Sequence, residues 1–261
     1  MFAEERIRKI KEILLEYEHV DINTLTSLLN ASVTTVRRDL DRLENEGFLL
    51  KAHGGAVLKH SSEFSTPMQT VETPYETEQQ QIARLAAKYV EDNDVLFLGS
   101  GHVSYLIARE LKNKKNLQVV TNNLKAAYEL SSQPLIKVFA TGGDVETTRD
   151  SVIFTGRLVA EQVSQFFFRK AFLAFSGISM EFGYTHNIRS EIPVFQTLMS
   201  HTAIPIAVAD YSRFDTTGFQ PVCGLDEIRT VMTNVTIPER YKDYYLSHGI
   251  RIFTSFEDLA F

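Results

Sequence analysis

The sequence has little cysteine and lacks the segments that mark exported or membrane proteins. Its 261 residues contain a single cysteine, Cys223, which excludes a disulfide framework and is typical of a reducing compartment. No apolar segment approaches the roughly 20 residues of a membrane span, and the N-terminus is charged rather than shaped like an export signal. We therefore expect a cytoplasmic protein with no membrane partner, in which Cys223 is a small core residue.

The sequence also lacks the motifs of several catalytic classes. It has no Gly-x-Ser-x-Gly elbow, no cluster of metal ligands and no nucleotide phosphate loop. An excess of positive charge is missing too, because the formal net charge is −6 at pH 7. A negative chain does not coat nucleic acid indiscriminately, so any DNA binding must come from a local basic face. We expect no enzymatic activity, no cofactor and no metal site.

Length and composition predict about two globular domains. Hydrophobic residues make up 44% of the chain, which is ample for a buried core. Residues 59–73 are polar, rich in Ser and Thr, and contain Pro67, as is typical of a linker. The expected organisation is a first domain over residues 1–58, a linker over 59–76 and a second domain over 77–261.

Residues 23–47 have the pattern of two short helices joined by a turn. The apolar positions expected in the first helix are Leu25, Leu28 and Leu29. Asn30 and Ala31 interrupt that pattern, and Ser32 is placed to cap the next helix. The apolar stripe expected in the second helix consists of Val33, Val36, Leu40 and Leu43.

The opposite face of the second helix carries hydroxyl and guanidinium groups. With the capping Ser32, the candidate DNA contacts on this helix are Thr34, Thr35, Arg37, Arg38 and Arg42. The first two turns of a recognition helix reach base edges and phosphates in the major groove, and these side chains suit that surface. The plainer alternative is a helical hairpin with solvated arginines, since charge on an exposed helix face usually indicates only solubility.

The flanking sequence completes a winged helix-turn-helix. Apolar residues at helical spacing upstream, from Ile7 to Leu14, predict a preceding helix that can close a three-helix core. Residues 48–52 and 53–57 read as a strand, a glycine turn and a returning strand. Lys51 and His53 on this wing are candidate contacts to the phosphate backbone, although a histidine there is more often a satisfied turn residue.

These motifs resemble the signature of a known family. Residues 32–40, Leu43-Glu44, Gly47 and the run His53-Gly-Gly-Ala56 are similar to the DeoR family of bacterial transcription regulators. The resemblance implies a regulator that binds double-stranded operator DNA and usually represses genes of sugar or polyol catabolism. In the family a phosphorylated metabolite releases the DNA; whether an effector releases or promotes DNA binding here stays open.

The second domain repeats one unit, in which a β-branched or aromatic run leads through a Gly or Asn turn into a helix. The expected strands are residues 95–98, 117–120, 136–140, 171–175, 204–209, 230–233 and 250–253. Near-continuous apolar strands alternating with helices predict an α/β fold with a parallel sheet covered on both faces. Ligands in such sheets bind where strands end and helices begin.

The first of these sheet corners is a glycine-rich loop that starts at Gly99. Its amides and the following helix start could hold an anion, or the glycines could serve only a tight turn, and both interpretations stay open. The candidate effector contacts in this loop are Ser100, Gly101, His102, Val103 and Ser104. Other strand ends expected at the same sheet edge add Asn122, Gly142, Gly177 and Asp210.

This domain resembles the effector domain of the DeoR family, which shares its fold with ribose-5-phosphate isomerase. The resemblance implies that the glycine loop cradles a phosphate and that Glu191 and Asp210 match family positions in the site. The chain departs from the pattern at four positions. Gly99 stands where the family usually has an acid, His102 and Val103 replace two threonines, and Phe195 replaces a lysine.

Without that lysine, the effector is either uncharged or held by another cation. The candidates are Arg189 and Arg213. Arg213 is the preferred substitute because it follows an expected strand at the sheet edge where the loops converge, whereas the direction of the turn at Arg189 does not follow from the sequence. A phosphorylated small sugar or polyol is the expected effector.

The isomerase resemblance raises one alternative, a sugar-phosphate isomerase-like enzyme with an appended DNA-binding module. Such chemistry needs a carboxylate base beside a carbonyl held by a cation. Residues 175–179 offer hydroxyls instead, and catalysis does not explain the winged helix. We therefore expect a repressor that forms a dimer or tetramer, because the first domain carries little net positive charge and paired modules match paired half-sites.

Overall fold

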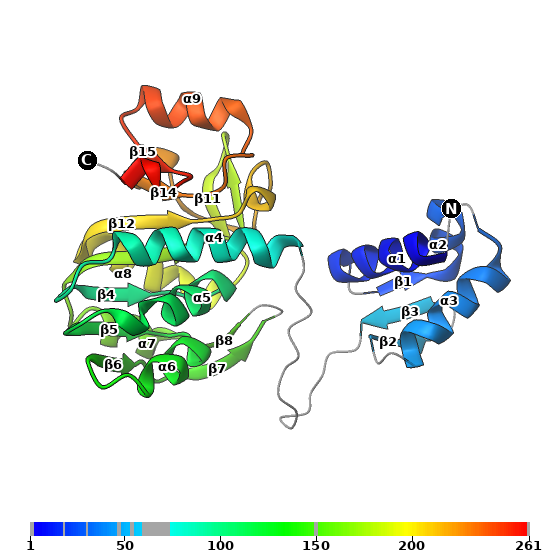
Figure 1. Cartoon of the computed structure of the whole chain (residues 1–261), viewed down its shortest axis with the longest axis horizontal. Helices are drawn as coiled ribbons and strands as arrows, with labels where there is room; N and C mark the ends of the chain where they lie inside the picture. The colour runs from blue at the N-terminus through cyan, green and yellow to red at the C-terminus, as the bar shows by residue number, and fades with distance from the viewer. Residues whose placement is uncertain are drawn as a thin grey trace. The chain divides into compact units, whose positions relative to one another are not determined.

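The structure is a computed structural model, and it describes residues 3–17, 19–29, 31–45, 48–52, 55–58, 74–148 and 151–259. The chain divides into two compact units, residues 1–70 and 71–261 (Figure 1). Most of the expected linker, Gly47 and His53 lie outside the described residues. A helix begins at Pro74, inside the end of the expected linker, and the domain limits stay a prediction.

The first unit is a winged helix-turn-helix, as predicted. Its elements are α1 (Ala3–Tyr17), β1 (His19–Asp21), α2 (Ile22–Leu29), α3 (Val33–Asn45), β2 (Leu49–Ala52) and β3 (Gly55–Leu58). The strands form an antiparallel sheet in the order β1-β3-β2, in which β2 and β3 are the wing and β1 was not predicted. The three helices share a core with fully buried Ile10, Leu14, Leu25, Val36 and Leu40.

Two residues predicted for the apolar stripes of this core are exposed instead. Leu28 is 54% exposed and Val33 is 40% exposed. Leu25 and Leu29 lie one turn apart and define the buried side of α2, so Leu28 falls at its edge. Val33 is the first residue of α3 and precedes the turn that packs on the core.

The second unit is built on a seven-stranded parallel sheet in the order β15-β14-β12-β9-β4-β5-β6. The strands are β4 (Val95–Leu98), β5 (Leu117–Thr121), β6 (Ile136–Ala140), β9 (Phe168–Ala174), β12 (Thr202–Val208), β14 (Thr230–Met232) and β15 (Arg251–Phe253). All seven coincide with predicted strands, within a few residues. The central pairing of β4 with β9 sets Leu96 opposite Lys170 and Leu98 opposite Phe172.

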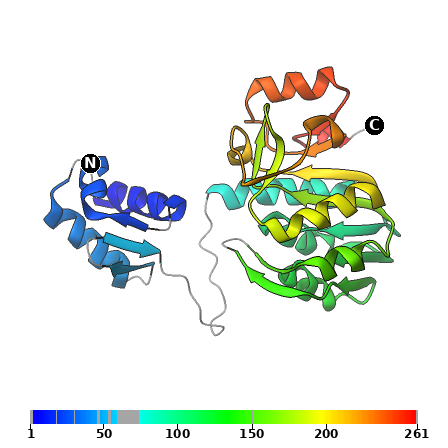
Figure 2. The ribbon, with the colours of Figure 1, turned by 180° about the vertical axis from the view of Figure 1, so that it is seen from behind.

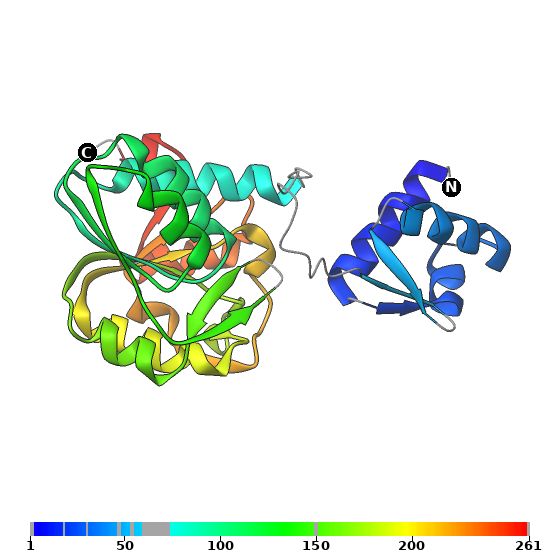
Figure 3. The same cartoon turned by 90° about the horizontal axis from the view of Figure 1, so that it is seen from below.

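Helices cover both faces of this sheet. On one side lie α4 (Pro74–Tyr89), α5 (His102–Glu110) and α6 (Leu124–Ser131), and on the other α7 (Arg157–Val163) and α8 (Ile192–His201) (Figure 3). Alternate strand residues face opposite cores, so Leu96 and Leu98 pack with the first set of helices and Phe97 with the second. This arrangement confirms the predicted α/β fold class.

Smaller elements join the face that carries α8, which lies toward the viewer in Figure 2. A three-stranded sheet has the order β10-β11-β13, with β10 (Gly177–Ser179), β11 (Gly183–His186) and β13 (Gln220–Cys223). Helix α9 (Glu239–Ser247) packs its buried Tyr241 and Tyr245 into the same core. Cys223 is half-buried beside this core.

The remaining elements of the described residues are a β-hairpin and five short 3-10 turns. The hairpin pairs β7 (Asp144–Thr147) with β8 (Val152–Thr155). The turns are η1 (Leu111–Asn113), η2 (Arg189–Glu191), η3 (Tyr211–Arg213), η4 (Leu225–Glu227) and η5 (Glu257–Leu259). The sequence did not predict the hairpin or the small sheet, because most of their strands mix polar and apolar residues instead of forming a continuous apolar run.

Candidate functional site

The predicted recognition helix is α3, and Ser32 caps it. The backbone N–H of Thr35 donates to Ser32 Oγ at 3.2 Å, and the two hydroxyl oxygens lie 2.9 Å apart. Beyond the cap, the exposed side chains of this helix include Thr34, Arg37, Arg38 and Arg42, whereas Thr35 is half-buried. The hydroxyl and guanidinium face therefore points away from the core of its unit.

A buried ion pair fixes the orientation of this face. Arg6 Nε of α1 lies 2.8 Å from Asp39 Oδ2 of α3, and Arg6 Nη2 lies 3.3 Å from Asp39 Oδ1. The hydrogen bond to Asp39 raises the pKa of the Arg6 guanidinium, which therefore keeps its positive charge at neutral pH. Two parallel contacts restrict rotation of α3 about its axis. Sequence reasoning missed this pair, although Asp39 stands beside the predicted apolar stripe.

On the wing, the structure describes the backbone of one predicted DNA contact and leaves the other outside the described residues. Lys51 lies in β2, where its backbone pairs with β3 opposite Ala56. His53 falls outside the described residues. Both stay predicted contacts to the phosphate backbone.

In the second unit the strand order reverses between β4 and β9, since the chain continues from β4 to β5 and β6 on one side and from β9 to β12 on the other. Such a switch point is where open α/β sheets bind ligands. A cavity of about 10 Å³, here called the inner cavity, lies at this point. Its lining consists of Phe97, Gly99, Ser100, Asn122, Leu173, Glu191, Val194, Phe195 and Leu198. Three predicted effector residues, Ser100, Asn122 and Glu191, meet there.

A chain of hydrogen bonds links buried polar side chains in the wall of the inner cavity. Asn122 Nδ2 donates to Glu191 Oε1 at 2.9 Å and to the carbonyl oxygen of Phe154 at 3.2 Å. Glu191 Oε2 lies 2.8 Å from His186 Nε2, and His186 Nδ1 lies 3.2 Å from Ser176 Oγ. Asn122 Oδ1 is buried and has no partner among the residues that the structure describes.

These contacts indicate one pattern of donors and acceptors. With a proton on Nε2, the His186 ring would donate to Glu191, and with none on Nδ1 it would accept from the Ser176 hydroxyl, which satisfies all three groups. Glu191 then accepts from two side chains, as a buried carboxylate requires. Sequence reasoning did not single out His186 or Ser176 as site residues; the available signal was a histidine five residues before Glu191.

The glycine loop is shaped by local packing. Gly101 has φ +90°, a conformation that favours glycine, and a Cβ at Gly99 would lie 3.1 Å from the carbonyl oxygen of Phe172. Ser104 is buried and donates to the Ser100 carbonyl oxygen at 3.1 Å, while the Val103 side chain lies in the core. Val103 and Ser104 can therefore offer a ligand only their backbone. His102 is half-buried, with its ring 5.7 Å from that of Tyr105.

Other predicted effector residues lie apart from the inner cavity. Asp210 caps η3 by accepting from Ser212 N at 3.0 Å, and it also accepts from Gln79 Nε2 at 2.7 Å. Arg213 is the last residue of η3 and does not line the inner cavity.

The two remaining predicted glycines have packing roles. Gly142 N donates to Gln162 Oε1 of α7 at 2.8 Å. A Cβ at Gly177 would lie 2.6 Å from the carbonyl oxygen of Thr216, so only glycine fits there. The predicted effector residues thus do not form a single group.

Phe195, which stands in place of the family lysine, is part of the hydrophobic core. It is 4% exposed, and its ring centroid lies 5.2 Å from that of Phe175 and 5.0 Å from that of His186. None of the described residues that line the inner cavity is Arg or Lys. The inner cavity therefore holds a carboxylate, Glu191, without a lining cation.

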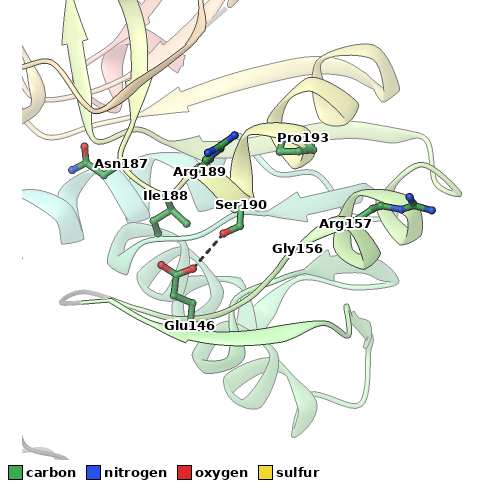
Figure 4. Close-up of a pocket in the computed structure, with 8 residues that line it drawn as sticks. All are labelled: Glu146, Gly156, Arg157, Asn187, Ile188, Arg189, Ser190 and Pro193. Carbon is green, nitrogen blue, oxygen red and sulfur yellow. Dashed lines mark hydrogen bonds between the residues drawn. The ribbon is translucent and has the colours of Figure 1, made fainter.

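A second, larger depression is lined by residues that include the sequence neighbours of Glu191 and Val194, namely Ser190 and Pro193 (Figure 4). This outer cleft has a volume of about 820 Å³ and is lined by Glu146, Gly156, Arg157, Asn187, Ile188, Arg189, Ser190 and Pro193. Ser190 Oγ donates to Glu146 Oε2 at 3.3 Å, which joins η2 to the β7–β8 hairpin. Arg189, the cation ranked second from the sequence, lies in this cleft.

No helix in the described part of the chain is both long and apolar enough to cross a membrane. Among the same residues, no group of three or more His, Cys, Asp and Glu side chains could hold a metal ion.

Comparison with known proteins covers both units. Residues 75–235 match the family described as "DeoR C terminal sensor domain", and residues 6–62 match that described as "DeoR-like helix-turn-helix domain". The chain is 30% identical to the HTH-type transcriptional regulator GolR of Listeria innocua, over 97% of this chain and 98% of that protein. It is 26% identical to the glycerol-3-phosphate regulon repressor of Escherichia coli, over 95% and 97% respectively.

Among solved structures, ribose 5-phosphate isomerase from Plasmodium falciparum is similar with a TM-score of 0.38 and 12% identity, over 54% of each chain. A likeness of this size carries no argument about activity. The function therefore rests on the family matches and on the geometry of the two units.

Proposed function

This chain belongs to the DeoR family of HTH-type transcriptional regulators, and we propose that it represses carbohydrate catabolism genes under the control of a phosphorylated sugar or polyol. Relatives support the class of gene and effector, since one is named a glycerol-3-phosphate regulon repressor and another a lactose phosphotransferase system repressor. As a regulator of operator DNA it acts in the cytoplasm, without enzymatic activity of its own.

The observation that carries DNA binding is the oriented outer face of α3. The Ser32 cap and the Arg6–Asp39 pair hold this helix so that Thr34, Arg37 and Arg38 are exposed together. Hydroxyl and guanidinium groups at that position suit base edges and phosphates. Thr35, Arg42, Lys51 and His53 complete the proposed DNA contacts.

The buried Asn122 side chain supports effector binding at the switch point. Its Oδ1 lacks a partner in the described structure, while its Nδ2 is committed to Glu191 and Phe154. An unsatisfied buried acceptor is costly, and the hydroxyl of a sugar or polyol would satisfy it. We therefore propose that Ser100, Asn122 and Glu191 contact the effector.

The isomerase-like alternative is less well supported by the same geometry. Both oxygens of Glu191 already accept hydrogen bonds, from Asn122 and His186, so the carboxylate is not placed as a free base. No described Arg or Lys lines the inner cavity to polarise a carbonyl. A sensing role needs neither feature.

We further propose that the active species is a homodimer or a tetramer. DNA-binding modules of this kind match paired half-sites, and linking two of them multiplies affinity through effective concentration. The second unit, with the larger core, is the proposed site of assembly.

Selection of operator sequences from a random duplex library, followed by fluorescence anisotropy, tests this function. We expect the full chain to enrich a paired motif and to bind it with a steep salt dependence. Adding phosphorylated sugars and polyols should then change the affinity for the selected duplex. Failure to enrich any motif would contradict the regulatory assignment, and binding that no sugar or polyol phosphate alters would contradict the effector class.

A further inference from the structure

The outer cleft contributes none of the effector contacts in the proposed function. We propose that it is the anion site of the effector domain, where Arg189 and Arg157 hold the phosphate of a phosphorylated sugar or polyol. This inference rests on the proposed function and places the phosphate away from both the glycine loop and Arg213. Four observations carry it.

The first observation is space. The inner cavity beside the glycine loop has a volume of about 10 Å³, which is room for about one water molecule. The outer cleft has about 820 Å³, within the range of small-molecule sites. A phosphate cannot enter the inner cavity without displacing packed side chains, whereas the outer cleft has room for one.

The second observation is charge. The inner cavity is lined by the Glu191 carboxylate and, among its described lining residues, by no Arg or Lys. The outer cleft is lined by Arg157, Arg189 and one acid, Glu146. A doubly negative group is repelled by the first environment and attracted by the second. A guanidinium can also bind phosphate through two parallel N–H bonds.

The third observation is availability of the two arginines. Arg189 is exposed and has no ion-pair partner among the residues described. The Arg157 side chain is 90% exposed and pairs with Glu161, four residues along the same helix, at 2.5 Å. Exposed pairs of this kind are weak, so Arg157 can exchange Glu161 for a phosphate by a change of rotamer. In Figure 4 the Arg157 side chain stands apart from Arg189 and points away from it, so the two arginines can hold one phosphate only after a change of rotamer.

The fourth observation is the rest of the lining, which suits hydroxyl groups. Glu146 pairs with Ile153 in the hairpin, and Gly156 lies three residues beyond Ile153, about 10 Å farther along an extended strand. A ligand with its phosphate near Arg157 can therefore reach Glu146 with its far end. There the carboxylate and Ser190, now bonded to each other, can bind hydroxyls.

The cleft is also connected to the inner cavity by the residues between them. Arg189 and Glu191 are the two ends of the turn η2, and Asn122 joins Glu191 to the Phe154 carbonyl, two residues before Gly156. A phosphate that draws Arg189 and Arg157 together therefore acts on the two groups that Asn122 joins. Arg189 is in the same turn as Glu191, and Arg157 follows the Phe154 carbonyl by three residues. Ligand binding in the outer cleft is thus transmitted to the switch point of the sheet.

Thermal shift and calorimetry on the full chain test this site with inorganic phosphate, glycerol 3-phosphate, glucose 6-phosphate and the two unphosphorylated compounds. We expect inorganic phosphate at tens of millimolar and one of the organic phosphates to raise the melting temperature. Arg189→Gln and Arg157→Gln should each weaken phosphate binding at least tenfold. The matched control is Arg84→Gln, which removes the same charge from an exposed side chain on α4 and should bind as the wild type does.

Arg213→Gln compares the two cation assignments directly. Normal phosphate binding by this variant, with loss in the Arg189 and Arg157 variants, supports the outer cleft. Loss in the Arg213 variant alone, or normal binding by an Arg157→Gln/Arg189→Gln double variant, overturns the inference but leaves the proposed effector class standing. Stabilisation by a free sugar but by no phosphate overturns both, while operator selection with the same protein tests the regulatory function separately.

Discussion

Replacing Asn122 with Ala tests the hydrogen-bonded wall of the inner cavity. The substitution removes the donor to Glu191 Oε1 at 2.9 Å and the donor to the Phe154 carbonyl at 3.2 Å. A bond to a charged group contributes about 1.5–3 kcal/mol and a neutral one about 0.5–1.5 kcal/mol. We therefore expect a loss of roughly 2–4 kcal/mol in the free energy of unfolding, or several degrees in Tm for a unit of this size.

Urea unfolding followed by far-UV circular dichroism measures this change, because the chain contains no Trp for fluorescence. The loss alone could reflect the cavity left by the side chain, so the decisive quantity is the coupling energy. A cycle of Asn122→Ala, Glu191→Ala and the double variant should give a coupling of at least about 1 kcal/mol. A coupling under about 0.5 kcal/mol would refute the contact and, with it, the role of Asn122 as a bridge.

Four further predictions concern both units. Arg37→Ala/Arg38→Ala should abolish specific operator binding and lower the dependence of the affinity on salt concentration, both measured by fluorescence anisotropy. Circular dichroism should show that the double variant stays folded. Unchanged affinity and salt dependence would remove the recognition-helix assignment. The second unit alone should oligomerise in light scattering and the first unit alone should bind DNA poorly, and a monomeric second unit with a tightly binding first unit would contradict this. Burial raises the pKa of Glu78, so the protonated carboxyl is favoured in the folded state. The stability that this protonated form contributes is lost as pH rises through the folded pKa. Glu78→Gln should therefore stabilise the protein at pH 7 and lose that advantage near pH 4 in calorimetric scans. Burial raises the pKa of Cys223 to about 12, which lowers the thiolate fraction, although a thiolate of higher pKa is a stronger nucleophile. The native thiol should therefore react with a disulfide reagent roughly 30- to 60-fold more slowly than the unfolded chain, and equal rates would be inconsistent with the half-buried site.

The sequence predicted the main sheet well because each strand is a local feature. Strands β4 and β6 have the predicted limits, Val95–Leu98 and Ile136–Ala140, since continuous apolar runs bounded by turn residues identify buried parallel strands. The Ser32 cap was predicted for the same reason, because its partner Thr35 is three residues away. Local spacing determines each of these features.

The candidate site was harder to predict because its contacts join distant segments. Asn122 meets Glu191 only after the main sheet is assembled, and Ser176 meets His186 only when the unpredicted strands β10 and β11 pair. Leu28 was placed in the core because spacing shows the side of a helix but not how far the neighbouring helix reaches. The cleft bounded by the hairpin and η2 was not predicted, and the preference for Arg213 stays a prediction.

The pairing of β4 with β9 affects the order in which the two units of the chain fold during synthesis. β4 ends at Leu98 and β9 begins only at Phe168, yet they lie side by side, with Leu98 opposite Phe172. Pairing strands so far apart is slow and must wait for the later strand to be synthesised. The first unit is complete by Leu58, and at about 5–20 residues per second the ribosome needs on the order of ten seconds more to deliver β9. A newly synthesised chain therefore folds its winged helix-turn-helix unit before its sensor unit. Regulation by an effector becomes possible only after the second of these units has folded.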